Sequence, residues 1–144
     1  MPMKTSARNQ FRGIVKAIKP GQVNAELTLS IAEGVELVAQ ITLESLHELG
    51  LAEGKEVWAL VKAQWVTLAS GGQSLRVSAR NRFHGKVAKV VPGAVNSEVQ
   101  VALGGGTVVT SIITKESVDS LGVAVGQELW AFFKAGSVIL AVEG

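Results

Sequence analysis

Apolar and polar residues alternate along several short stretches of the chain, and this pattern predicts β-strands. The clearest stretch is "NAELTLSI", residues 24–31, in which every second residue from Ala25 to Ile31 is apolar and the residues between them are polar. A preceding strand is expected over residues 11–19, because Pro20-Gly21 after it is a turn signal.

A third strand is expected over residues 35–41. A short helix follows, because Thr42 is a good N-cap and Gly50 is a good C-terminal stop for two helical turns. Residues 55–63 are apolar on both faces and predict a fourth strand, and a short fifth strand ends at Leu68. Five short strands with one small helix between the third and the fourth follow the order of an OB-like barrel.

The whole pattern occurs twice. Residues 6–69 align without a gap with residues 78–141, an offset of 72, and 29 of the 64 aligned positions are identical. Two copies are too few for a solenoid, so we expect two tandem modules, residues 1–69 and 78–144, joined by a flexible polar linker over residues 70–77. The predicted fold is all-β with short helices, built as two tandem OB-like five-stranded barrels.

The fourth strand of each module places large side chains on its outer face. Trp58 and Leu60 are expected to point outward, and Trp130 and Phe132 repeat them in the second module. Such residues form either a stacking platform for bases or a surface that packs against another module. Packing is favoured, because the neighbouring residues are aliphatic and the chain has no tyrosine.

The composition is that of a globular protein, with 47% hydrophobic and 18% charged residues in 144. A module of roughly 70 residues with so much apolar surface buries it poorly alone, which favours an oligomer. The net charge of +2 permits an anionic ligand without requiring nucleic acid. The absence of cysteine excludes disulfides and thiolate metal sites. No apolar run reaches the ~18 residues of a membrane helix, so a cytoplasmic protein without a membrane partner is expected.

Polar residues that are identical in both copies are candidates for a site, since a duplicated site keeps its residues twice. They include hydroxyls, a guanidinium, an ammonium and amides, which are donors suited to a small oxyanion. The donors of the first copy are Ser6, Arg8, Asn9, Asn24, Thr42, Ser45 and Lys62, and those of the second are Ser78, Arg80, Asn81, Asn96, Thr114, Ser117 and Lys134.

Each of these residues also has a structural interpretation. Thr42 and Ser45 alone suit helix capping better than ligand binding, and Glu44 between them would repel an anion. Arg8 alone suits a surface ion pair, and Lys62 alone suits a solvated strand end. The residues by themselves leave oxyanion binding and these structural roles open.

Catalytic patterns are absent from the repeat. His47 aligns with Asp119 and His84 aligns with Arg12, so neither histidine is repeated and nothing supports a triad or a metal-cation site. No Walker loop or dinucleotide fingerprint occurs. We therefore expect a protein that is not an enzyme and holds no cofactor.

Four spaced motifs occur in the same order in both copies: "SARN-x-F-x-G", "PG-x-VN-[AS]-E", "IT-x-ES…LG" and "W-A-x-x-KA-x-x-V-x-LA". Together they resemble the Mop domain of the molbindin family of molybdate-binding proteins, over residues 6–141. The resemblance implies an OB-like fold, a homotrimer whose six modules form a ring, and molybdate or tungstate ions held between modules. The implied role is molybdenum storage and homeostasis in the cytoplasm.

The resemblance also implies which residues hold the ion. One module supplies the donors of the opening motif and of the end of the fourth strand, and its neighbour supplies the hydroxyls at the start of the helix. A second class of site, on the threefold axis, is placed near Val23, Asn24, Val95 and Asn96. The residues implied for the main sites are Ser6, Ala7, Arg8, Lys62, Ala63, Thr42 and Ser45, and in the second copy Ser78, Ala79, Arg80, Lys134, Ala135, Thr114 and Ser117.

An OB-fold protein that binds single-stranded nucleic acid is the alternative hypothesis. The order of the elements and the basic isoelectric point of about 9.1 favour it. The sparse aromatic residues and the mild net charge count against it, so no nucleic-acid partner is expected. A sensor or an importer subunit is not expected either, because neither a DNA-binding helix pair nor an ATPase module accompanies the repeat.

Overall fold

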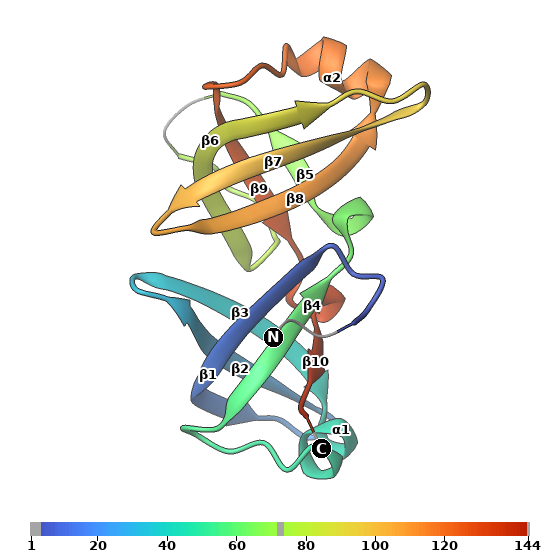
Figure 1. Ribbon diagram of the computed structural model, residues 1–144. Helices are drawn as coiled ribbons and strands as arrows, with labels where there is room; N and C mark the ends of the chain where they lie inside the picture. The colour runs from blue at the N-terminus through green and yellow to red at the C-terminus, as the bar shows by residue number, and fades with distance from the viewer. Residues whose placement is uncertain (1–3, 72–73, 144) are drawn as a thin grey trace. The chain divides into compact units, whose positions relative to one another are not determined.

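The structure is a computed structural model that describes residues 4–71 and 74–143, and its strands form two antiparallel sheets of five strands each (Figure 1). The first sheet contains β1 (Asn9–Pro20), β2 (Asn24–Ala32), β3 (Val35–Thr42), β4 (Glu56–Val61) and β10 (Ile139–Ala141). The second contains β5 (Thr67–Ala69), β6 (Asn81–Val91), β7 (Asn96–Gly104), β8 (Thr107–Thr114) and β9 (Glu128–Phe133). The helices are α1 (Leu43–Glu48) and α2 (Lys115–Leu121), and two 3₁₀ turns are η1 (Ala63–Trp65) and η2 (Ala135–Ser137).

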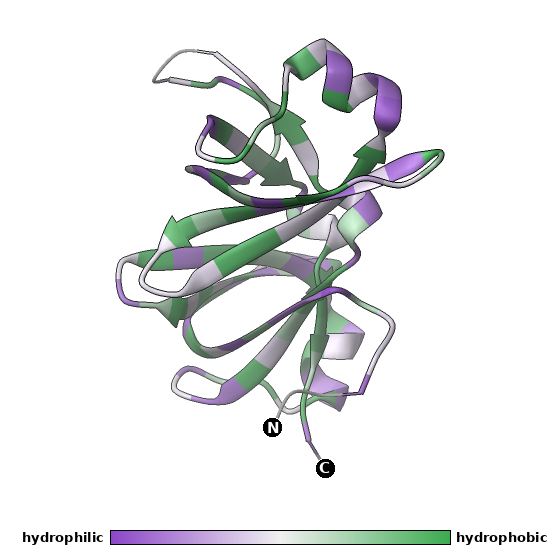
Figure 2. Ribbon diagram, turned by 45° about the horizontal axis from the view of Figure 1, so that its top comes forward, coloured by the Kyte–Doolittle hydropathy of each residue, from purple (hydrophilic) through white to green (hydrophobic). Residues whose placement is uncertain are grey.

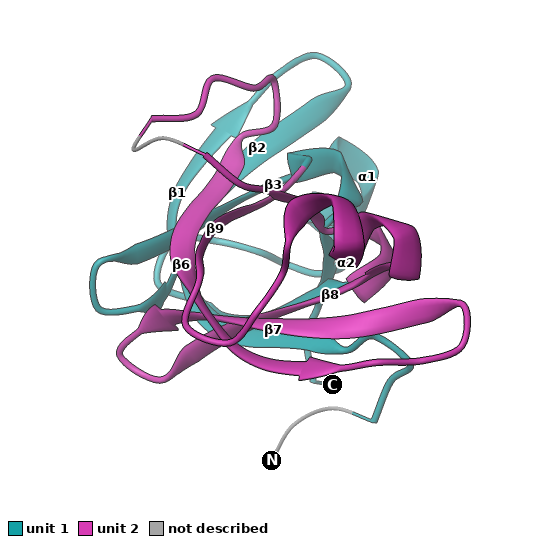
Figure 3. Cartoon of the chain, turned by 90° about the horizontal axis from the view of Figure 1, so that it is seen from above, with its two compact units in different colours: residues 1–61, 134–144 teal, residues 62–133 magenta. Residues whose placement is uncertain are grey.

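The two copies of the repeat exchange their last strands. The first sheet has the order β10-β4-β1-β2-β3, so its edge strand comes from the second copy. The second sheet has the order β5-β9-β6-β7-β8, so its edge strand comes from the first copy. The two compact units are accordingly residues 1–61 with 134–144, and residues 62–133 (Figure 3).

The units therefore differ from the modules expected from the sequence. Residues 62–69 of the first copy belong to the second unit, because β5 pairs with β9. Residues 134–144 of the second copy belong to the first unit, because β10 pairs with β4. The expected linker, residues 70–77, belongs to the second unit, and its Gly72 and Gln73 lie outside the described residues. The chain passes from one unit to the other after Val61 and again after Phe133.

Each sheet curls until its two edge strands meet. In the first unit β10 contacts β3, and η2 also packs against β3. In the second unit β5 contacts β8, and η1 packs against β8. The strand order together with these edge contacts is that of an OB-like barrel, so the predicted fold class is confirmed.

A bulge and a glycine allow β1 to curve. Residues 9–14 of β1 pair with β4, residues 14–20 pair with β2, and the register shifts between Val15 and Ala17. A Cβ atom on Gly13 would lie 2.9 Å from the carbonyl oxygen of Ser30, which explains the glycine of the "SARN-x-F-x-G" motif. The second copy repeats both features in β6, where the corresponding glycine is Gly85.

The predicted alternation of β2 is confirmed. Ala25, Leu27 and Leu29 are buried, and the residues between them are partly exposed. Val99 and Val101 of β7 occupy the same places in the second core. Figure 2 shows the resulting mixture of hydrophobic and hydrophilic segments along the strands of both units.

The outer face of β4 is more buried than the sequence pattern implies. Trp58 is 8% exposed and Leu60 is 7% exposed, although both alternate with the barrel-filling residues. Trp58 lies opposite Ala141 of β10, and its Nε1–H donates to Glu143 Oε1 at 3.4 Å. This burial favours the packing role in the first copy, whereas the equivalent residues of β9, Trp130 and Phe132, are half-buried.

One buried hydrogen bond holds the exchanged segment that precedes β5. The Ser111 hydroxyl, which is fully buried on β8, donates to the carbonyl oxygen of Val66 at 2.7 Å. We expect Ser111→Ala to lower the free energy of unfolding by about 1–3 kcal/mol, since it removes the donor from a buried carbonyl. Urea denaturation of Ser111→Ala and of a control, Ser30→Ala at an exposed position on β2, measures this effect. Equal stabilities of the two variants would show that the bond contributes nothing.

Candidate functional site

The opening motif begins β1, and its four residues have different roles. Ser6 and Arg8 are exposed, whereas Asn9 is buried and donates from Nδ2 to the carbonyl oxygen of Val61 at 3.1 Å. Asn9 also pairs with Val61 across the β1–β4 ladder. The asparagine therefore joins the start of β1 to the end of β4, and Ser6 and Arg8 remain at the surface as candidates for ligand binding.

Local hydrogen bonds shape the loop that carries Ser6. The N–H of Ala7 donates to Thr5 Oγ1 at 3.0 Å, and Gln10 Nε2 donates to the Ala7 carbonyl oxygen at 3.2 Å. The Ala7 N–H would have to leave Thr5 in order to bind an ion. In the second copy Val77 replaces Thr5 and offers no hydroxyl for this bond.

The register of β1 and β4 brings the two cationic candidates to one end of the strand pair. Arg8 directly precedes Asn9 and Lys62 directly follows Val61, and Asn9 pairs with Val61. The second copy has the same register, because Asn81 pairs with Phe133. Arg80 directly precedes Asn81, and Lys134 directly follows Phe133. Both lysines are exposed, and the alanines after them, Ala63 and Ala135, are buried at the start of η1 and η2.

The hydroxyls at the helix starts form matched pairs. Thr42 caps α1, because its Oγ1 accepts from the Ser45 N–H at 3.1 Å, and its own hydroxyl donates to Ser45 Oγ at 3.0 Å. Thr114 and Ser117 repeat both bonds at α2 at 3.0 and 2.9 Å. Since each pair uses one hydroxyl hydrogen internally, the other can be donated to a ligand. The predicted capping role of Thr42 is confirmed.

The residues expected near a threefold axis lie beside these helix starts. Asn24 pairs with Thr42, and the N–H of Leu43 donates to the Val23 carbonyl oxygen at 2.9 Å. The second copy repeats this arrangement, with Asn96 opposite Thr114 and the Val95 carbonyl oxygen bonded to the Lys115 N–H. Val23 is 71% exposed and Val95 is 74% exposed, so both hairpin tips present bare apolar side chains.

The two donor groups of one unit lie at opposite ends of its sheet. The opening motif lies where β1 begins, and Thr42 lies beside Asn24, just past the end of β1 at Pro20. The strand between them spans on the order of 35 Å along its curved path at ~3.3 Å per residue. Figure 1 shows α1 and the start of β1 well separated within the first unit. An ion with hydrogen bonds of about 3 Å to Ser6 or Arg8 would therefore lie away from the Thr42–Ser45 pair of the same unit.

The exchanged strand creates a cavity in the second unit. It measures about 350 Å³ and lies between the segment after Lys62 and the start of α2. Its polar lining includes Gln64 and Thr67 from the first copy of the repeat, with Asn96, Thr114 and Ser117 from the second. The structure thus brings the turn after Lys62 into the same unit as the helix-start hydroxyls of the second copy.

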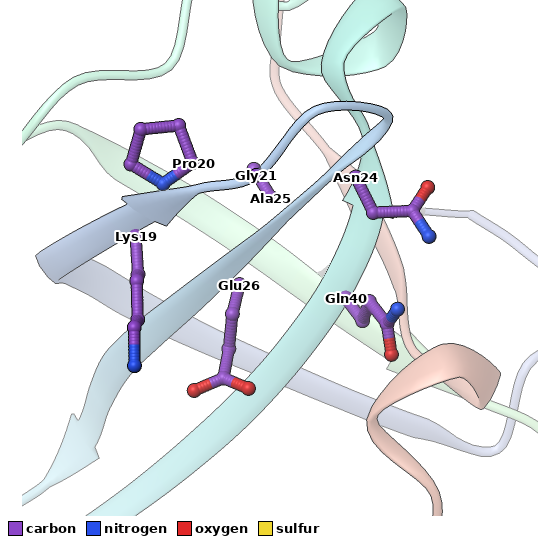
Figure 4. A pocket seen from close by; sticks show the side chains of 7 residues that line it. All are labelled: Lys19, Pro20, Gly21, Asn24, Ala25, Glu26 and Gln40. Atoms are coloured by element: carbon purple, nitrogen blue, oxygen red, sulfur yellow. The ribbon is translucent and has the colours of Figure 1, made fainter.

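Another cavity, of about 260 Å³, lies at the turn between β1 and β2 (Figure 4). Lys19, Asn24, Glu26 and Gln40 provide its polar groups, and the side chains of Lys19 and Glu26 run in the same direction. The carboxylate of Glu26 makes this cavity a poor place for a dianion. Val91 and Ile112 replace Lys19 and Gln40 in the second copy, so the polar lining is not duplicated.

The remaining charged and aromatic groups make separate, local contacts. Within residues 4–71 and 74–143, no three acidic or histidine side chains gather in a way that could hold a metal ion. Arg12 donates to Glu56 Oε2 at 2.6 Å, and this bond raises the pKa of the guanidinium above its usual value. His84 packs against Trp130 with ring centroids 4.9 Å apart.

No helix in the described part of the chain is long and apolar enough to cross a membrane.

Comparison with protein families identifies the class. Residues 5–68 and 77–140 each match the TOBE domain, so the chain belongs to the TOBE-domain family and contains two tandem copies of the domain. These matched ranges follow the sequence repeat and not the compact units, because the strand exchange crosses their ends.

Individual relatives make the similarity more specific. The chain is 46% identical over 142 residues to the molybdenum-pterin-binding protein MopA of Rhodobacter capsulatus, covering 99% of this chain and 54% of MopA. It is 47% identical over 144 residues to the molybdenum transport protein ModE of Azotobacter vinelandii, covering 100% of this chain and 53% of ModE. The chain therefore spans about half the length of these curated relatives.

A solved structure is similar over its full length. It is a crystal form, with molybdate bound, of the cytoplasmic molybdate-binding protein ModG. The TM-score is 0.92 at 50% sequence identity, and the match covers 98% of this chain and 100% of the other. The expected resemblance to two-module molybdate-binding proteins of the Mop type is thereby confirmed.

The sequence left two structural roles around the candidate site unrecognised. Asn9 was grouped with the surface donors, but it is buried against Val61. The strand exchange was also missed, although it determines which unit contains the turn after Lys62. The burial of Asn9 could have been suspected from its position at the first paired residue of an apolar strand.

Substitutions at α1 separate the capping role of Thr42 from the contribution of the Ser45 hydroxyl to stability. We expect Thr42→Val to lower the free energy of unfolding by about 1 kcal/mol, because the cap of the Ser45 N–H is lost. Ser45→Ala keeps that N–H and should change stability by less than about 0.5 kcal/mol. Thermal or urea unfolding of both variants checks this difference. A Ser45→Ala variant as unstable as Thr42→Val would mean that the Ser45 hydroxyl is structural.

Proposed function

We propose that this chain binds molybdate and tungstate as oxyanions at sites between modules of a homotrimer, and that it serves molybdenum storage and homeostasis. The observation that carries the proposal is the full-length similarity to a ModG structure with molybdate bound. MopA is named a molybdenum-pterin-binding protein and ModE a molybdenum transport protein, and both names support a ligand that contains molybdenum.

The chemistry of the candidate residues agrees with this ligand. Molybdate at neutral pH is a tetrahedral dianion whose oxygens only accept hydrogen bonds, so the groups that contact it must be donors. Arg8 and Lys62 carry two positive charges at one end of the β1–β4 pair, and Ser6 adds a hydroxyl. Sulfate has the same charge, so selectivity against it depends on the size of the enclosed space.

The separation of the donor groups explains why the site is proposed between modules. Each unit presents an arginine at the start of its first long strand and a hydroxyl pair at the opposite end of its sheet. In the proposed assembly, Ser6, Ala7, Arg8, Lys62 and Ala63 face the hydroxyls of Thr42 and Ser45 on a neighbouring module. The corresponding second set is Ser78, Ala79, Arg80, Lys134 and Ala135 with Thr114 and Ser117.

The exposed hairpin tips support the second class of site. Val23 and Val95 are exposed next to the amides of Asn24 and Asn96, and three such tips meeting at an axis would bury apolar surface. We place the axial oxyanion sites there, near the backbone that leads into α1 and α2.

Thermal unfolding in the presence of candidate ligands tests the proposal. Molybdate or tungstate at about 100 times its Kd should stabilise the protein by roughly 2.7 kcal/mol, because only the folded state binds the ion. Sulfate at the same concentration should have a much smaller effect. Stabilisation by a short single-stranded oligonucleotide, with none by molybdate, would instead support the nucleic-acid hypothesis.

The variant Arg8→Ala with Arg80→Ala tests the residue assignment in the same assay. It should remove most of the stabilisation by molybdate and leave the oligomer intact, as measured by analytical ultracentrifugation. A matched control is Arg12→Ala, since Arg12 pairs with Glu56 and not with the candidate donors. Unchanged molybdate affinity in the double variant would overturn the assignment of the arginines.

A further inference from the structure

A single turn places an aromatic ring under one of the candidate lysines. The N–H of Trp65 donates to the Lys62 carbonyl oxygen at 2.9 Å, which closes the 3₁₀ turn η1. In such a turn the side chains of residues i and i+3 lie nearly over one another. The Lys62 ammonium accordingly lies 5.7 Å from the centroid of the Trp65 ring, within the range of a cation–π interaction.

The second copy of the repeat has the same turn without the ring. The N–H of Ser137 donates to the Lys134 carbonyl oxygen at 2.9 Å, the same distance as in η1. The backbone angles also agree, with φ −67° and ψ 138° at Lys62 and φ −75° and ψ 146° at Lys134. The chain therefore contains two equivalent lysines that differ in whether an indole lies beneath them.

The ring lowers the conformational entropy that the lysine loses when it binds an ion. A lysine side chain has much rotamer freedom, and holding it against an anion costs conformational entropy. An indole face attracts the ammonium and restricts it in advance, and the N–H donors that point away from the ring remain available to an acceptor. Trp65 is 42% exposed, so the pair lies at the surface, where an ion can reach it.

We infer that Trp65 is a positioning residue that prepares Lys62 for the oxyanion, so that the sites containing Lys62 bind molybdate more tightly than the sites containing Lys134. This inference rests on the proposed function. The difference in affinity arises because Trp65 of the first copy corresponds to Ser137 in the second. Trp65 itself does not contact the ion.

The test uses full-length chains in which only one class of site keeps its lysine. Lys134→Met leaves the Lys62 class, and Lys62→Met leaves the Lys134 class, with the length of the side chain retained. Molybdate affinity is measured by isothermal titration calorimetry. In the Lys134→Met background, adding Trp65→Ser should weaken binding by about 2- to 5-fold. In the Lys62→Met background, Trp65→Ser should have no effect, and Ser137→Trp should strengthen binding by a similar factor.

A conservative variant separates the ring from simple packing. Trp65→Phe keeps an aromatic face and should restore most of the affinity that Trp65→Ser loses. The same variant should remove any molybdate-dependent fluorescence change that arises from Trp65, with Trp58 and Trp130 as the remaining tryptophans. Thermal unfolding without ligand confirms that each variant is folded at the temperature of the titration.

The outcomes distinguish this inference from the proposed function. Failure of the unsubstituted chain to bind molybdate would contradict the proposed function, and the inference with it. If the unsubstituted chain binds molybdate but Trp65→Ser leaves the affinity of the Lys62 class unchanged, only the inference is wrong. An equal loss from Trp65→Ser in both lysine backgrounds would likewise overturn it, because the effect would not act through Lys62.

Discussion

Each five-stranded sheet depends on a short strand that the other copy of the repeat supplies. β10 pairs with β4 through Ile139, Leu140 and Ala141, and β5 pairs with β9 through residues 67–69. Without these three-residue strands, β4 and β9 would each expose a row of unpaired backbone groups along one edge. The two copies are thus joined by backbone hydrogen bonding as well as by the chain itself, because each copy of the repeat supplies one strand to the sheet of the other.

The exchange also determines where the candidate ion-binding residues lie. The chain leaves the first unit directly after Val61 and leaves the second directly after Phe133, so Lys62 and Lys134 occupy the two crossing points. The buried asparagines of the opening motif fix the strand ends beside these points, since Asn9 pairs with Val61 and Asn81 with Phe133. The backbone positions from which the arginine and the lysine extend are therefore set by sheet register.

Much of this arrangement could be predicted from local pattern. The alternation of residues 24–31, the cap at Thr42 and the repeat offset of 72 were sufficient for the strands, the helices and the barrel order. The strand exchange could not be predicted, because "VTLA" at residues 66–69 and "VILA" at residues 138–141 have the same pattern and fit either sheet equally well. Hydrophobic periodicity specifies the face of a strand but not the partner it pairs with.

For the candidate site, the sequence suggested the residues but not their surroundings. Repetition suggests which residues are donors, and the register places the opening motif and Thr42 at opposite ends of the first sheet. The different environments of equivalent residues were not visible in the repeat, because they arise from non-identical neighbours such as Trp65 and Ser137. Sequence identity between the copies therefore does not make the surroundings of equivalent residues identical.

We propose that the ion lies between a cationic group of one module and a hydroxyl pair of another. A crystal structure with tungstate, located by its anomalous scattering, tests this claim directly. We expect tungstate within hydrogen-bond distance of Arg8 or Arg80 and of a Thr-Ser hydroxyl pair from a neighbouring module. Tungstate held within a single unit, away from both arginines, would contradict it.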